Sequence, residues 1–405
     1  LIAGQRRYTG SSSQCESCGG EHSSATFDSE GNFESTTDFN GVETRYEHDV
    51  ARTLETSRTE AYGTPRERTI TTDWHPTFRL PEEINEPGRR TEFTYDTNGN
   101  VLTQTITDTT TSESRTWTMT YSTLGQLLAV DGPRTDVTDV TTLTYYACTT
   151  GDECGQLHTV TDAANNVTTY NTYNAHGLPL TLTDPNGTSI ALAYDSRQRL
   201  TSRTVAGEAT GFEYWPTGLL KKITHPDGSF VSYGYDAAHR LTSVTDPAGN
   251  TITYTLNGAG QRLTEEVRDA TSALTFRRSH VYDDLGRLIE EQGTAGQVTS
   301  FDYDEAGNLI EIEDPVGRIT EQGFDELNRL ASITDPALSL TELEYDDLDN
   351  LLSVTDPRAL ATSYVYNGFG EQVSQSSPDT GTSSSPRDPA GNLDTSTDAR
   401  SEAAD

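Results

Sequence analysis

The stretch VTSFDYDEAGNLIEIEDPVG at residues 298–317 decides the fold. Apolar and acidic side chains alternate on both sides of a Gly-Asn turn at 307–308, and an Asp-Pro turn at 314–317 ends the stretch. Period-two alternation bounded by Gly, Asn and Asp-Pro is typical of consecutive antiparallel strands. The stretch therefore predicts two strands, joined and followed by tight turns.

The same unit recurs along the chain, as an aromatic anchor, an Asp, a short turn and then Leu. The expected anchors are Phe27, His48, Trp74, Tyr95, Tyr121, Tyr146, Tyr173, Tyr194, Tyr214, Tyr235, Leu256, Tyr282, Tyr303, Phe324, Tyr345, Tyr366 and Arg387. Ten of their sixteen spacings are 21 residues, one is 20, and five are 25 to 27. Such a fixed period indicates a repeat protein. We interpret the longer units as turn insertions.

Helix signals are nearly absent, so the predicted fold class is all-β, with tandem hairpins forming one long antiparallel ribbon. Two strands per unit give about 34 strands, and at ~4.8 Å per strand the ribbon is roughly 160 Å wide. Sheets of that width curl because their strands twist, which predicts a hollow spiral shell. We divide the chain into a lead-in segment at 1–26, repeats at 27–386, and a truncated further repeat at 387–405.

The composition excludes several partners. The chain has 63 acidic and 28 basic residues, a formal net charge of −35, and only two lysines. Nucleic-acid backbones need clustered Lys and Arg, so nucleic-acid binding is excluded. No apolar run reaches the length of a membrane span. The chain begins Leu-Ile-Ala-Gly without a Met, which predicts a piece of a longer protein.

Copies such as Tyr282-Asp-Asp-Leu-Gly286 and Tyr303-Asp-Glu-Ala-Gly307 resemble the YD repeat of bacterial Rhs and related wall-associated proteins. The repeat also occurs in toxin-complex C subunits and teneurins. The resemblance covers about residues 27 to 393. It implies a hollow β-shell that, in polymorphic toxins, encloses a C-terminal toxin released by an aspartyl self-cleavage segment. In other members the resemblance implies a surface or adhesive structure.

The chain departs from the toxin-delivering form at the cleavage segment. The family segment resembles Pro, four residues, Asp-Pro-x-Gly and then Leu. The nearest match here begins at Asp388, but Ser383 replaces the leading Pro and Asn392 replaces the Leu. We interpret this stretch as one more repeat turn. No toxin or cleavage site is expected within these residues.

Four cysteines form two local pairs, Cys15 with Cys18 and Cys148 with Cys154. A disulfide in each pair is the favoured interpretation, and it fits an oxidising, extracellular compartment. For the first pair, half of a zinc site with His22 or a redox pair are the alternatives. Zinc usually needs four ligands, and a redox site needs a βαβ context that the chain lacks.

No catalytic residue and no cofactor are predicted. Acidic residues recur throughout and are expected on a solvated face. Calcium is an alternative because clustered carboxylates attract it, but no Asp-x-Asp-x-Asp-Gly loop occurs and the run from Asp131 to Asp139 resembles one only weakly. The scattered histidines form no arguable catalytic order. Aromatic side chains are expected to pack across strands, although Trp117 and Trp215 are candidates for carbohydrate stacking.

The predicted function is a non-enzymatic wall of a secreted or cell-surface bacterial protein. Its expected partner is a C-terminal toxin or effector outside this chain, or further repeats of the same protein. If acidic side chains also line the interior, a basic cargo would be favoured. The alternative is an extracellular structural or adhesive protein that assembles into a filament or layer through its open strand ends, or that binds surface carbohydrate.

Overall fold

The computed structural model describes residues 23–148 and 150–400 and the backbone at 403–404. These residues form a 35-stranded sheet, and no helix occurs among them. The lead-in cysteines Cys15 and Cys18, together with His22, lie outside the described residues. The structure thus confirms the predicted all-β class and comes within one strand of the predicted number.

The first half of the sheet contains β1 (Ser24–Phe27), β2 (Phe33–Thr37), β3 (Glu43–Asp49), β4 (Leu54–Glu60), β5 (Arg68–Trp74), β6 (Pro81–Glu86), β7 (Arg89–Tyr95), β8 (Val101–Asp108), β9 (Ser114–Tyr121), β10 (Leu127–Asp131), β11 (Thr141–Tyr145), β12 (Leu157–Thr161), β13 (Val167–Tyr173), β14 (Pro179–Thr183), β15 (Ser189–Tyr194), β16 (Leu200–Val205), β17 (Glu208–Tyr214) and β18 (Leu220–Thr224). The second half contains β19 (Phe230–Tyr235), β20 (Leu241–Thr245), β21 (Thr251–Leu256), β22 (Arg262–Arg268), β23 (Leu274–Tyr282), β24 (Leu288–Gln292), β25 (Val298–Tyr303), β26 (Leu309–Glu313), β27 (Ile319–Phe324), β28 (Leu330–Thr334), β29 (Leu340–Tyr345), β30 (Leu351–Thr355), β31 (Ala361–Tyr366), β32 (Gln372–Ser377), β33 (Gly381–Ser384), β34 (Ser396–Thr397) and β35 (Ala403–Ala404).

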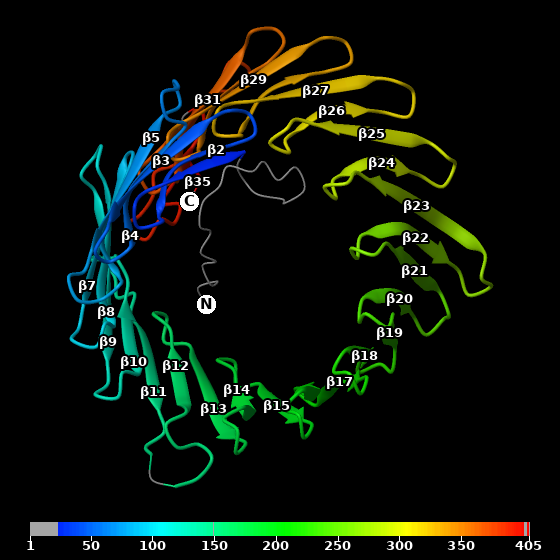
Figure 1. Cartoon of the computed structure of the whole chain (residues 1–405). Coiled ribbons are helices and arrows are strands. Elements are labelled where there is room, and N and C mark those ends of the chain that lie inside the picture. The colour runs from blue at the N-terminus through cyan, green and yellow to red at the C-terminus, as the bar shows by residue number, and fades with distance from the viewer. Residues whose placement is uncertain (1–22, 149, 401–402, 405) are drawn as a thin grey trace. The chain divides into compact units, whose positions relative to one another are not determined.

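Strands pair antiparallel with their neighbours in sequence, as the predicted tandem hairpins require (Figure 1). In a typical unit, Ser332 of β28 faces Glu342 of β29, and Tyr345 faces Leu351 of β30. The ribbon has two kinds of turn. We call the turn after an odd-numbered strand an opening turn, and the turn after an even-numbered strand a closing turn.

The aromatic anchors end the odd-numbered strands, directly after a register shift in the ladder. The shift before Tyr345 falls between Glu344 and Tyr345. Tyr345 therefore contacts both neighbouring strands of β29. It pairs with Leu351 of β30, and its hydroxyl donates at 3.0 Å to the carbonyl of Leu330, the first residue of β28. Tyr95, Tyr173 and Tyr214 donate in the same way to Pro81, Leu157 and Leu200. Each of these four tyrosines therefore links its strand to the strands on both sides.

One anchor was assigned wrongly. Tyr145, not Tyr146, ends β11, pairs with Leu157 after the register shift, and donates to the Leu127 carbonyl at 2.9 Å. Tyr146 begins the following loop, and its hydroxyl donates to the Tyr170 carbonyl at 2.8 Å. Two adjacent tyrosines beside a long insertion hid the register, because either one satisfies the aromatic pattern.

The longer units are not all turn insertions. The turn after β8 spans 109–113, as long as the ordinary closing turn at 246–250. The extra residues of that unit lengthen β8 and β9 to eight residues each, and in a later unit β22 and β23 reach seven and nine. Both strands of such a hairpin grow toward the closing turn, so the residues nearer the opening turn keep their face of the sheet and strand growth is tolerated as easily as loop growth.

Few apolar side chains are buried. Among the described residues, only Leu54, Ala61 and Tyr173 form the buried apolar set. Burial raises the pKa of the Tyr173 hydroxyl to about 12. A single sheet has no second layer to cover it, so ladder hydrogen bonds, cross-strand pairs and turns carry much of the stability.

Aspartates hold the turns at both edges of the ribbon. In the opening turn at 236–240, one carboxylate oxygen of Asp236 accepts hydrogen bonds from the N–H groups of Ala238 and Arg240, each at 2.9 Å. In the closing turn at 184–188, Asp184 accepts from Asn186 and Thr188. Asp is favoured in turns because its side chain can bond the backbone two residues on. Many of the acidic residues are therefore turn ligands.

These turns predict an acid-sensitive fold. Hydrogen bonds from the turn lower the carboxyl pKa below 3.8 at Asp28, Asp96, Asp162, Asp184, Asp195, Asp236, Asp246, Asp269, Asp314, Asp335 and Asp356. A lowered folded-state pKa adds stability that is present above the unfolded-state pKa and lost as the pH falls through the folded-state value. Circular dichroism during urea unfolding should show stability falling below about pH 4. A rise would mean that relief of acidic repulsion outweighs the turns.

By contacts, the chain divides into two compact units. The first comprises residues up to Thr120, Asp131–Thr138 and Phe301 onward, and the second comprises Tyr121–Val130 and Asp139–Ser300. The first unit joins hairpins from both ends of the sequence, and these contacts form the candidate functional site.

Candidate functional site

A seam in the first unit joins hairpins that are far apart in sequence. Figure 1 draws early strands such as β3 in the same part of the view as late strands such as β29, and the two sets of hairpins meet through their turns. The residues that hydrogen-bond across the seam are separated by 256 to 290 positions, as in Asn40 with Asp304 and Asp38 with Asn328. The ribbon therefore folds back against itself within this unit.

The seam joins opposite edges of the ribbon. Opening turns from 304–308 to 388–392 provide the late edge, and closing turns from 38–42 to 132–140 provide the early edge. The contacts follow chain order, since the turn at 304 meets Asn40, the turn at 346 meets Arg68, and the turn at 388 meets Arg134. Successive turns along one edge thus meet successive turns along the other.

Asp108 lies at the centre of the seam and is only 1% exposed. One carboxylate oxygen accepts from the N–H groups of Thr110 and Thr111 in its own turn. The other accepts from the N–H of Gly368 at 2.8 Å. Burial acts to raise the carboxyl pKa, but the three N–H donors outweigh it and lower that pKa. Asp108 is therefore an ionised seam contact.

Gly368 fits this place because it has no side chain. A Cβ atom there would lie 2.6 Å from the carbonyl oxygen of Gly88, 2.7 Å from Cγ of Asp108 and 2.8 Å from its Cα. Such distances are shorter than packed atoms adopt, so the two edges approach closely only with glycine at 368.

Arg115 forms the second buried contact and is 5% exposed. Its guanidinium donates to both carboxylate oxygens of Glu371, at 2.7 and 2.8 Å, and lies 3.8 Å from the ring centre of Phe369. The hydrogen bonds from Arg115 lower the pKa of the Glu371 carboxyl, against a smaller opposing effect of burial. A bidentate, stacked arginine fixes both the distance and the orientation of the two edges.

A cleft of about 460 Å³ lies where the turn at 325–329 meets β2, β3 and β4. Leu327 enters it from the late edge, and Phe33 and Tyr46 line it from the early edge. Nearby, Arg68 donates to both Glu60 and Asp349, each at 2.7 Å. Because Leu327 of the late edge lines this cleft together with residues of the early edge, and ion pairs lie beside it, the cleft is part of the seam.

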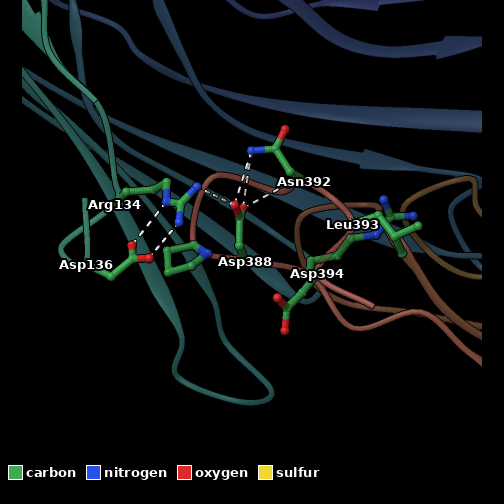
Figure 2. Close-up of a pocket in the computed structure, with 8 residues that line it drawn as sticks. Arg134, Asp136, Asp388, Asn392, Leu393 and Asp394 are labelled. Atoms are coloured by element: carbon green, nitrogen blue, oxygen red, sulfur yellow. Dashed lines mark hydrogen bonds and ion pairs between the residues drawn. The ribbon is translucent and has the colours of Figure 1, made fainter. Parts of the chain in front are cut away.

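A second cleft, of about 540 Å³, lies at the end of the seam (Figure 2). Arg134 lies between two carboxylates, at 2.6 Å from Asp136 and 3.0 Å from Asp388. Asp388 also accepts from the N–H groups of Ala390 and Asn392, each at 2.9 Å. Burial acts to raise the pKa of Asp388, but Asn392, Ala390 and the Arg134 charge outweigh it and lower it.

Asp388 therefore has the hydrogen bonds of an ordinary repeat turn. Arg387 occupies the anchor position and bridges to Leu393, as an anchor does. This geometry agrees with the interpretation of 388–391 as a repeat turn. The predicted boundary between the repeats at 27–386 and a truncated repeat at 387–405 is not tested by these contacts, and it stays a prediction.

The sequence of these hairpins matches a family model described as RHS Repeat. The matched windows are residues 152–189, 173–210, 214–251, 235–273, 282–319, 303–338 and 345–382, which together cover slightly more than half of the chain. The chain belongs to the RHS-repeat family. Among curated proteins, no sequence relative matches it.

Solved toxin-complex structures share the fold of these RHS repeats. A crystal structure of TcdB2-TccC3 without its hypervariable C-terminal region matches with a TM-score of 0.55 and 14% identity, over 93% of this chain and 27% of that chain. The Tc holotoxin pore of Photorhabdus luminescens matches with a TM-score of 0.52 and 16% identity, over 92% and 24%. The RHS chain therefore spans about a quarter of the length of the solved chains that it matches.

The structure joins Cys148 to Cys154 in a disulfide within the RHS insertion loop, with their Cα atoms 4.2 Å apart. The ends of this loop are also held by backbone hydrogen bonds between Tyr146 and Gln156 and between Gly155 and Tyr146. The cysteine pair therefore lies across a loop that hydrogen bonds already close.

Replacing both Cys148 and Cys154 by Ser should loosen this loop alone. Chain entropy for so short a ring predicts a loss of about 2 kcal/mol. Hydrogen exchange should increase at 146–157 and stay unchanged at 330–366. Equal increases in both segments would contradict a local role.

The other predicted site residues do not converge in the part of the chain that the structure describes. No group of three or more His, Cys, Asp or Glu side chains there is placed to hold a metal ion. Calcium binding stays a prediction, as does carbohydrate stacking. Trp117 and Trp215 belong to different units, and the Trp215 ring nitrogen donates to the Tyr233 carbonyl. No helix in the described residues is long and apolar enough to cross a membrane.

The seam is the candidate functional feature that the sequence analysis missed. One signal could have indicated it. The third residue after the anchor is large and apolar in three consecutive RHS repeats, as Leu327, Leu348 and Phe369. All three take part in the seam, since Leu348 lies 3.8 Å from the place of a Gly88 Cβ atom. Elsewhere this turn position is mostly small or polar.

Proposed function

We propose that this RHS-repeat chain is a non-enzymatic wall segment of a secreted or cell-surface bacterial protein, and that the wall isolates a C-terminal effector outside the chain. The observation that carries the proposal is the seam. A ribbon whose late edge binds its own early edge through buried, oriented contacts can close a surface rather than remain an open sheet. Asp108 and Arg115 provide those contacts.

The polar chemistry of the described residues supports a structural role. The turn aspartates and the seam carboxylates described above have lowered pKa values and accept hydrogen bonds within turns or across the seam. A general acid at neutral pH needs a raised pKa instead. The buried arginine has a carboxylate partner within its own chain. We infer that the chain works by steric isolation, and that activity belongs to the enclosed effector.

The fold likeness supports the choice of cargo. One matched structure is described as lacking a hypervariable C-terminal region of TcdB2-TccC3, and another is a holotoxin pore. By analogy, we propose that the protein containing this chain has an effector after its repeats. The acidity of the chain favours a basic effector, provided that acidic side chains face it. Retention of such an effector should then weaken with added salt.

Electron microscopy of the purified chain tests the wall. The expected result is closed, hollow particles with the mass of one 44.2 kDa chain. A variant with Arg115→Met is the matched comparison, and its particles should open because Glu371 then loses its buried partner. Extended ribbons for the unaltered chain would overturn the proposal.

The second candidate, an extracellular structural protein that assembles through its edges, is favoured by one observation. Large apolar side chains are exposed at turn tips on both edges of the ribbon, as at Leu285 and Leu338. In the same experiment, filaments or layers of joined copies would favour this candidate.

A further inference from the structure

The seam shows how an opening turn of this chain recognises a closing-turn edge. An apolar tip, the third residue after the anchor, is placed against the opposite hairpins. Leu327 enters the cleft beside Phe33, and Phe369 lies under Arg115. We call an apolar side chain at this turn position a knob.

Two more knobs have no such contact. Leu124 and Leu285 occupy the same position after the anchors Tyr121 and Tyr282, and are 79% and 60% exposed. Their turns are built like those of the seam, since the Ser122 hydroxyl accepts from the N–H of Leu124 and Asp283 accepts from that of Leu285. Exposing leucine at a hydrogen-bonded turn tip is unfavourable in water. We therefore interpret Leu124 and Leu285 as contact residues whose apolar partner is not within this chain.

The complementary half is also exposed. In the first unit, the closing-turn edge between β26 and β29 has a row of apolar side chains, Val316, Ile319, Leu338 and Leu340. We call this row the 316–340 patch. All four residues are exposed, and Val316 and Leu338 reach 74% and 84%. Val316 and Leu338 lie in two consecutive closing turns, the type of turn that receives the late edge in the seam, and Ile319 and Leu340 begin the strands that follow.

We propose that two copies of this chain associate head to tail, with a knob of one copy, Leu124 or Leu285, placed on the 316–340 patch of the other. A second copy is the occupant that the structure favours, because the seam already shows that the opening-turn edge of this chain fits its own closing-turn edge. The contact is heterologous, so both halves remain available and association continues beyond two copies. This inference rests on the second candidate function, assembly through the edges, and names the side chains that would make the contact.

Charge sets the conditions for association. Each copy has a formal net charge of −35, so two copies repel at low ionic strength. Added salt screens this repulsion and leaves the apolar contact in place. Association should therefore strengthen as salt increases, in contrast to an association held by ion pairs.

Sedimentation velocity of the full chain, with paired variants, tests the proposal. The patch variant has Val316→Asp and Leu338→Asp, and the knob variant has Leu124→Asp and Leu285→Asp. Each variant alone should associate at least about tenfold more weakly than the unaltered chain, equivalent to about 1.4 kcal/mol. An equal mixture of the two should associate again but form no long assemblies, because the patch variant keeps only knobs and the knob variant keeps only the patch.

A matched control carries Val365→Asp, which changes an exposed valine within β31, outside both the knobs and the 316–340 patch. It should associate like the unaltered chain, and circular dichroism should show all variants folded. A chain that stays monomeric at high salt and high concentration overturns the proposal but leaves the wall function standing. Dimers of the knob variant alone would also overturn it, because they would show a patch-to-patch contact.

Discussion

Replacing Arg115 by Met should weaken the seam by about 3 kcal/mol. We expect no larger effect from replacing one member of any other ion pair described here. The substitution keeps much of the side-chain volume over Phe369 but removes both hydrogen bonds to Glu371. It leaves the carboxylate of Glu371 at a site where an uncompensated charge is costly. Glu371 should then take up a proton more readily, with a raised pKa.

Hydrogen exchange is the appropriate measurement, because repeat ribbons open locally rather than in one step. Protection should fall at 108–116 and 367–373 and persist in hairpins of the second unit, such as β17 and β18. Replacing Arg115 by Met together with Glu371 by Leu should restore most of the loss, because no unpaired charge then remains.

Arg45 provides the matched control for this prediction. Its guanidinium also pairs with a carboxylate, Glu43 at 2.9 Å, and also stacks on a ring, Tyr62 at 3.5 Å, but the pair is exposed to solvent. Exposed pairs contribute at most about 1 kcal/mol, so Arg45→Met should have a small effect. Equal effects at positions 45 and 115 would refute the assignment of Arg115 as a seam contact.

Replacing Gly368 by Ala should open the seam by a different route. The added methyl group would overlap the Gly88 carbonyl and the backbone of Asp108, neither of which is the end of a flexible side chain. Overpacking of this kind costs about 1–3 kcal/mol, and separation of the edges would also break the hydrogen bond from Gly368 to Asp108. Hydrogen exchange at 86–90 and 108–111 should report this opening.

Gly258 is the control for that substitution. It occupies the same place in its own opening turn, two residues after the anchor Leu256, and a Cβ atom there would meet nothing within 4 Å. Gly258→Ala should therefore leave local protection unchanged or slightly increased, because alanine restricts the unfolded chain. If both substitutions reduce hydrogen-exchange protection equally, the loss of protection in Gly368→Ala reflects a change in the turn itself and not opening of the seam.

Together these variants connect the seam to the proposed wall. If the seam closes the wall, then Arg115→Met and Gly368→Ala should both open the particles seen by electron microscopy, while the two controls should not. If hydrogen exchange shows the seam open but the particles stay closed, the wall depends on other contacts.

The sequence alone determined the hairpin ribbon, because every signal it needs is short in range. Alternation within five or six residues sets the two faces of a strand, and Asp with Gly or Asn sets each turn. This is why the unit at 298–317 predicted the whole ladder. Where two equivalent signals competed, as at Tyr145 and Tyr146, the register was lost, because one extra residue in a loop costs almost nothing.

Only the tertiary structure decided the seam. Its partners lie 254 to 290 residues apart in sequence, and no local pattern relates Arg115 to Glu371 or Asp108 to Gly368. Which turns meet depends on the twist summed over many strands, and a small difference per strand shifts the contact by a whole repeat. The sequence could indicate that Leu327, Leu348 and Phe369 need a partner. Accumulated twist decided which hairpins became that partner.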